Sequence, residues 1–142
     1  MGRFVNPDNS AFQNAVNSEI YIDKSGLIEL TNRFLGTPQE FICNSRPRRF
    51  GKSMAANMLA AYYSKGCDSR ELFKGLQIEK NADYEKYLNK FDVIHFDVQW
   101  CFKEAGSAEK TVSFITQTIL AELRDIYGAV IPEYVDKVSG AL

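Results

Sequence analysis

The chain has 142 residues, with 45% hydrophobic and 25% charged side chains, which is typical of a soluble globular protein with enough apolar material for one core. Its 17 basic and 18 acidic side chains leave a net charge of −1, which excludes an overall positive field that attracts nucleic acid or membrane. The chain has neither a charged-then-apolar leader nor an apolar run near the length of a membrane span. We therefore expect a cytoplasmic protein with no membrane partner.

The spacing of apolar residues predicts helices and short strands in alternation. Ser25 is placed to cap the second expected helix, and Ser107 opens the last and longest one. The helices are expected over about 11–19, 26–35, 52–64, 83–90 and 107–127, with a short helix, a glycine turn and an extended exit within 69–78. Two short apolar runs have the pattern of strands, EFICN (40–44) and DVIHFDV (92–98).

The order of these elements predicts an α/β fold with a parallel sheet. No internal repeat or low-complexity linker divides the chain, so one domain is expected. Two strands rarely form a stable open sheet. We therefore expect residues 1–142 to be the N-terminal part of a domain, with further strands after residue 142.

The stretch NSRPRRFGKSMAANML (44–59) joins the first expected strand to the helix after it. Gly51, Lys52 and Ser53 complete the second half of the phosphate-loop pattern G-x-x-x-x-G-K-S/T. In this pattern the glycine admits a close backbone approach, the lysine reaches the terminal phosphates and the hydroxyl binds Mg²⁺. The following helix adds N–H groups that point at an anion. We favour phosphate binding over the alternative, a solvated basic turn.

The first half of the pattern differs, because Arg46 stands where the first glycine is expected. Pro47 biases Arg46 toward extended geometry, so we expect the strand to run one residue further before the chain turns. The residues predicted to bind ATP with its Mg²⁺ are Arg46, Pro47, Arg48, Arg49, Phe50, Gly51, Lys52, Ser53 and Met54.

Asp97 is the acid that the sequence offers as a catalytic candidate. It ends VIHFD, which has the Walker B form, an apolar strand followed by an aspartate that holds the metal. Val98 follows where a second acid is usual, so we favour a structural role for this strand. His95, on the same strand, is expected to be a half-buried polar residue rather than a ligand.

Four segments, in order, resemble the bacterial AAA-ATPase-like family, whose members are described as predicted AAA-ATPases. They are YIDKSGLIELTNRF (21–34), RPRRFGKS (46–53), LFKGLQI (72–78) and DVIHFDV (92–98). Arginine is usual at the position of Arg46 in that family, whereas the related archaeal and STAND-type ATPases read G-P-R-R-x-G-K-S/T. The first two segments are the specific ones, and the four together cover almost the whole chain.

The resemblance implies a P-loop NTPase fold, a three-layer sandwich with a parallel sheet. It implies that Lys52 contacts the β- and γ-phosphates, that Ser53 binds Mg²⁺ and that the amides of residues 48–53 surround phosphate. It places the family's acidic metal-binding segment just after residue 142, so Asp97 loses the Walker B role. This chain is then expected to bind nucleotide without hydrolysing it. The resemblance gives no role to Asp23 or Lys24.

The resemblance also implies partners. AAA relatives often form rings, so a homo-oligomer is implied. Longer family members often carry a C-terminal nuclease-like domain of the PD-(D/E)XK type. Two other functions stay open: an interaction or regulatory module with a degenerate nucleotide loop, and a contact with nucleic-acid phosphates through the basic loop. The net charge of −1 counts against the contact with nucleic acid.

Overall fold

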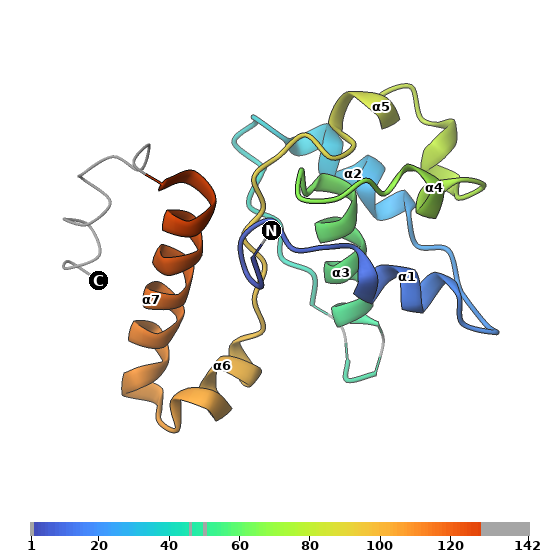
Figure 1. The fold of residues 1–142 in the computed structure, drawn as a ribbon. Coiled ribbons are helices and arrows are strands. Elements are labelled where there is room, and N and C mark those ends of the chain that lie inside the picture. Colours follow the sequence, from blue (N-terminus) through green and yellow to red (C-terminus); the bar gives the residue numbers. More distant parts are fainter. Residues whose placement is uncertain (1, 46, 50, 129–142) are drawn as a thin grey trace.

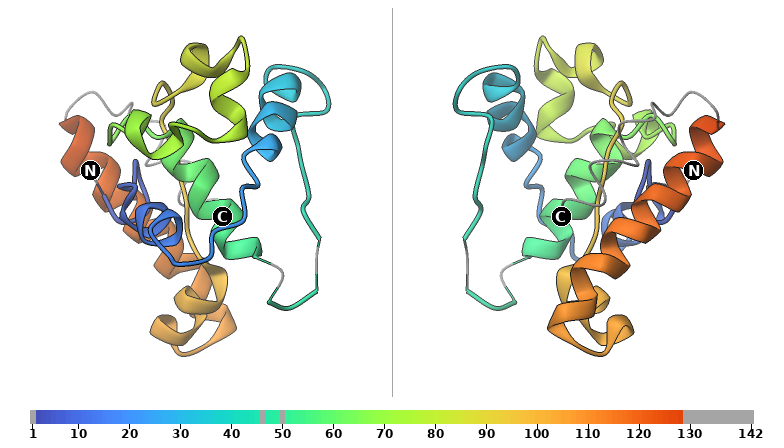
Figure 2. Two further views of the ribbon diagram at one scale, coloured as in Figure 1. Left: turned by 90° about the vertical axis from the view of Figure 1, so that its right-hand side faces the viewer. Right: turned by 90° about the vertical axis from the view of Figure 1, so that its left-hand side faces the viewer.

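A computed structural model describes residues 2–45, 47–49 and 51–128. Within these residues the chain forms the α-helices α1 (Ser10–Val16), α2 (Gly26–Phe34), α3 (Lys52–Tyr63), α4 (Arg70–Phe73), α5 (Tyr84–Tyr87), α6 (Val98–Ala105) and α7 (Ala108–Tyr127), and the 3-10 helix η1 (Gln77–Lys80). Figure 1 shows α1 to α5 gathered around α3, with α6 and α7 as a hairpin to one side. Figure 2 shows that α7 and α2 lie on opposite sides of α3.

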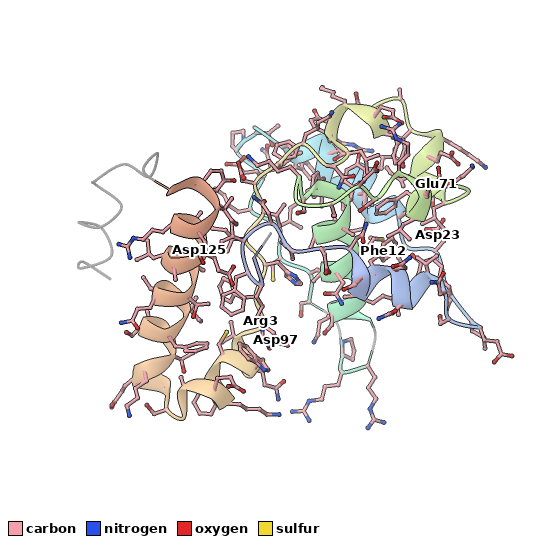
Figure 3. The ribbon with its side chains drawn as sticks, in the orientation of Figure 1. Arg3, Phe12, Asp23, Glu71, Asp97 and Asp125 are labelled. Carbon is pink, nitrogen blue, oxygen red and sulfur yellow. The ribbon has the colours of Figure 1, made fainter. Side chains whose placement is uncertain are left out.

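The core forms where α1 and α4 pack on α3. Ala55, Met58 and Tyr62 recur along α3 at a helical spacing, which places them on one buried face. Phe12 lies where α1 meets α3 (Figure 3) and stacks on Phe73 of α4, with ring centroids 4.9 Å apart. Tyr62 meets Phe73 edge-on, with centroids 5.5 Å apart. Burying one such ring stabilises the fold by about 1.5–3 kcal/mol, so these contacts fix both helices on α3.

Asp23, just before α2, ties this helix to η1. Its two carboxylate oxygens accept hydrogen bonds from the N–H groups of Ser25 (2.8 Å) and Gln77 (2.7 Å). The buried Ser25 hydroxyl accepts a third bond, from the N–H of Ile78 (3.1 Å). Ser25 is the N-cap residue of α2 as predicted, but its side chain makes no capping bond to α2. Its hydroxyl bonds to the N–H of Ile78 in η1 instead. We call residues 23–25 the Asp23–Ser25 clamp.

The longer predicted helices are confirmed as α2, α3 and α7, with bounds within one residue of those expected. Helices α1 and α5 are shorter than expected, and the exit after Gly75 coils into η1 instead of running extended. Helix α6 was not predicted, because it begins at the end of an expected strand. Among the described residues, no helix combines the length and the apolar character needed to cross a bilayer.

The predicted parallel sheet is wrong, and with it the three-layer α/β sandwich. The described residues form helices and no strand. Residues 40–45 run extended, with Phe41 90% exposed, and none of them forms a β-bridge within the part of the chain that the structure describes. Residues 91–97, which we call the linking segment, are also extended. Their only bridges among the described residues are isolated ones, Val5 with Ile94 and Ser64 with Phe91.

The backbone of the linking segment forms hydrogen bonds with residues that are not in strands. The N–H of His95 donates to the carbonyl of Phe4 (2.8 Å), and the N–H of Phe91 donates to the carbonyl of Tyr63 at the end of α3 (2.9 Å). The segment is therefore held between the N-terminal residues and α3, instead of beside the first expected strand. Alternating apolar side chains predict an extended backbone, but they do not specify the neighbouring strand that a sheet also needs.

Glu122 of α7 holds the N-terminal segment. Its carboxylate accepts hydrogen bonds from the backbone N–H groups of Arg3 (3.0 Å), Phe4 (2.8 Å) and Val5 (2.8 Å). The Arg3 guanidinium lies over the Trp100 ring of α6, with its carbon 3.6 Å from the ring centroid. These contacts attach the start of the chain to the α6–α7 hairpin.

Candidate functional site

Gly51 sets the start of α3. Its backbone is left-handed (φ 77°, ψ 26°), a conformation that costs a residue with a side chain about 1–2 kcal/mol. The Gly51 carbonyl accepts a helical bond from the N–H of Ala55 at 2.9 Å. The N–H groups of residues 52–54 precede this bond and point out of the helix end, where the helix dipole is positive. This geometry favours an anion at the N-terminus of α3.

The first turn of α3 carries three of the predicted binding residues. Lys52, Ser53 and Met54 are all exposed, so an ammonium and a hydroxyl stand at the helix end. Nowhere in the described ranges do three His, Cys, Asp or Glu side chains form a group that could hold a metal ion. A Mg²⁺ ion bound to phosphates needs few protein ligands, because it keeps several waters, so one hydroxyl such as that of Ser53 suits it.

The loop before α3 is exposed and basic. Pro47, Arg48 and Arg49 are all exposed, and Arg49 has a left-handed backbone with φ 66°. Arg46 and Phe50, which were also predicted to bind nucleotide, lie outside the described residues. The structure therefore places seven of the nine predicted residues, in a loop and helix turn that are continuous apart from those two positions.

A cavity of about 410 Å³ opens beside Gly51, within the size range of small-molecule sites. Its walls come from α2, from the extended residues before the loop, from α3 and from η1. The lining residues include Lys24, Leu27, Leu30, Asn44, Gly51 and Gln77. A second cavity of about 240 Å³ shares Leu27 and Asn44 with the first and adds Lys52.

Lys24 reaches the same end of α3 from the segment before α2. A Cβ atom built on Gly51 would lie 2.8 Å from Lys24 Nζ, so the ammonium lies directly against the glycine. The Asp23–Ser25 clamp fixes the backbone on both sides of Lys24. The two ammonium groups of Lys24 and Lys52 and the positive end of α3 therefore adjoin neighbouring cavities.

Sequence reasoning missed three residues of this site. Lys24, Asn44 and Gln77 line the larger cavity, but none of them belongs to the phosphate-loop pattern. The available signal was that YIDKS and LFKGLQI both resemble segments of one family. The structure shows these two segments in direct contact through Asp23 and Gln77, at the wall of the cavity.

The Asp23 carboxylate is held in its charged form. Burial raises its pKa, but hydrogen bonds from Ser25 and Gln77 outweigh burial and hold the pKa below its ordinary value. Asp23 is therefore ionised at neutral pH, and its oxygens are engaged by backbone N–H groups. This arrangement makes it a support for Lys24 rather than an acid or a base.

Asp97 stands at the N-cap of α6. Its carboxylate accepts a hydrogen bond from the N–H of Trp100 at 3.0 Å. The residue is the last one of the linking segment and does not end a strand of a sheet. His95 is half-buried, as expected from the sequence, and burial lowers the pKa of its imidazole.

Comparison with known proteins defines the family. The family model described as Predicted AAA-ATPase matches residues 10–138, so this chain belongs to the AAA-ATPase-like family, and the resemblance seen in the sequence is confirmed. The matched range contains the Asp23–Ser25 clamp, the basic loop and α3. No curated protein and no solved structure matches the chain. A predicted ATPase family is consistent with a nucleotide-binding module.

Proposed function

We propose that this chain binds the phosphates of Mg-ATP at the N-terminus of α3. The observation that carries the proposal is the left-handed Gly51, which opens α3 with Lys52 and Ser53 in its first turn, beside a cavity. In this proposal the N–H groups of residues 52–54 bind phosphate oxygens, the Lys52 ammonium contacts the β- and γ-phosphates, and the Ser53 hydroxyl is a ligand of Mg²⁺. Membership of a predicted ATPase family supports it.

The larger cavity is where we place the rest of the nucleotide. Leu27 and Leu30 offer apolar surface to a base, and the side-chain amides of Asn44 and Gln77 offer hydrogen bonds. A mixture of apolar walls and a few polar groups is typical of small-molecule sites. The cavity begins at Gly51, so a nucleotide lying in it would carry its phosphates to the end of α3.

The test is calorimetric titration of the folded chain with ATP and ADP, with and without Mg²⁺. The wild type should bind both nucleotides, and Mg²⁺ should tighten ATP binding. Lys52→Ala should weaken ATP binding by about 2 kcal/mol, because it removes a charge-assisted contact to phosphate. This loss corresponds to roughly a 30-fold higher dissociation constant.

Lys110→Ala is the matched control. Lys110 also lies in the first turn of a helix and is also exposed, but α7 has no phosphate-loop pattern before it. This variant should bind ATP like the wild type. A folded wild type without saturable ATP binding, or a Lys52→Ala variant that binds ATP unchanged, would contradict the proposal.

A further inference from the structure

Lys24 brings a charged group to the N-terminal end of α3. Lys24 is half-buried, lines the larger cavity and brings its Nζ to within 2.8 Å of where a side chain on Gly51 would begin. A cation beside the positive end of a helix is repelled by the helix dipole. The Lys52 ammonium, at the same helix end, adds to this repulsion. An anion bound between these groups would turn the repulsion into attraction.

The backbone around Lys24 is fixed by hydrogen bonds on both sides. Asp23 and Ser25, on either side of it, are both hydrogen-bonded to η1. The carbonyl of Lys24 itself accepts a bond from the N–H of Leu27 at 3.0 Å, at the start of α2. The backbone that carries Lys24 is therefore held in place before a ligand binds, which lowers the backbone entropy lost on binding.

We infer that Lys24 is a second phosphate-binding cation of the site, which contacts the phosphate chain of the nucleotide together with Lys52. This inference rests on the proposed function and extends it. The ligand class it defines is a nucleoside di- or triphosphate, since two ammonium groups and a helix end match several negative charges better than one. The absence of a side chain at Gly51 leaves room for the Lys24 ammonium at the helix end.

The experiment compares Lys24→Gln with the wild type in titrations with ATP, ADP and AMP in the presence of Mg²⁺. Glutamine keeps much of the length of the side chain and removes the charge. ATP affinity should fall by roughly tenfold or more, ADP affinity by less, and AMP affinity by threefold at most, because the affected contact lies on the outer phosphates. Lys24→Arg, which keeps the charge, should bind ATP within about threefold of the wild type.

Lys110→Gln is the control for loss of a lysine charge away from the site, and thermal unfolding without nucleotide shows whether each variant is folded. Lys24→Met, which keeps the apolar stem of the side chain, replaces Lys24→Gln if that variant does not fold. An unchanged ATP affinity in either uncharged variant overturns the inference and leaves the proposed function standing. An equal loss for ATP and AMP also overturns it, because it indicates a role in the shape of the cavity. A wild type that binds no nucleotide overturns both proposals.

Discussion

Two features of the structure favour glycine at position 51, the left-handed backbone and the close contact with Lys24. Its φ of 77° lies in the left-handed region that favours glycine, and the Lys24 ammonium occupies the space that a side chain would take. Gly106, at the end of α6, has the same φ of 77°, but nothing lies within 4 Å of a Cβ built there. Both glycines therefore have a left-handed backbone, but only Gly51 contacts Lys24.

This difference gives a matched pair of variants. Gly51→Ala and Gly106→Ala should each lower the free energy of unfolding by about 1–2 kcal/mol, because both place a side chain in the left-handed region. Only Gly51→Ala should also weaken ATP binding, since its methyl group pushes Lys24 aside. Urea unfolding measures the stability change, and calorimetry measures the binding. Equal ATP affinities of the two variants would show that the contact between Gly51 and Lys24 has no part in binding.

At the scale of elements, the Asp23–Ser25 clamp joins α2 to η1 through two hydrogen bonds, and a third bond lies within the clamp itself. Two of them run to residues more than 50 positions away along the chain. The clamp thereby closes a long loop that contains the basic loop and all of α3. The site consequently depends on a contact that lies outside the phosphate-loop pattern.

Asp23→Ala should lower the free energy of unfolding by about 1–2 kcal/mol, as expected for a partly exposed carboxylate that accepts hydrogen bonds. Asp8→Ala is the control, because the hydrogen bonds of the Asp8 carboxylate to described residues are local ones, to Ser10. Since folding lowers the pKa of Asp23 from its ordinary 3.8, its contribution is present above pH 3.8 and is lost as the pH falls through the lower folded value. Urea unfolding at neutral and acid pH should therefore show the gap between wild type and Asp23→Ala closing in acid.

Local patterns predicted local features well. The apolar spacing that places Met58 and Tyr62 on one face of α3 also gave the bounds of that helix, which begins at Lys52 as predicted. The strands were wrong because Phe41 and its neighbours have the side chains of a strand without a partner in the described structure. Lys24 was missed for a related reason, since the contact that brings it to Gly51 is long-range.

At the scale of the whole molecule, the linking segment connects the group around α3 to the α6–α7 hairpin (Figure 1). His95 lies in this segment and is half-buried. Burial lowers the pKa of its imidazole from the ordinary 6.5, and the nearby Asp97 carboxylate opposes this with a smaller effect. The neutral form of His95 is therefore the one that fits the folded chain.

The lowered pKa of His95 makes the free energy of unfolding depend on pH. The contribution of neutral His95 to stability is complete above pH 6.5 and decreases as the pH falls from 6.5 through the lower folded pKa. His95→Gln cannot be protonated, so its free energy of unfolding should fall less than that of the wild type between about pH 7.5 and about pH 5.5. Urea unfolding at both pH values measures this. A wild type that loses no more stability than His95→Gln would show that the imidazole is free to take up its proton in the folded chain.

The bonds from residues 3–5 to Glu122 have a consequence for the order in which the protein assembles. Their donors leave the ribosome before their acceptor, which follows 117–119 residues later. At about 5–20 residues per second, the N-terminal segment waits roughly 6–24 seconds for its acceptor to be made. Residues 3–5 therefore reach their final position only after Glu122 has been made, and for that interval their backbone N–H groups are open to other acceptors.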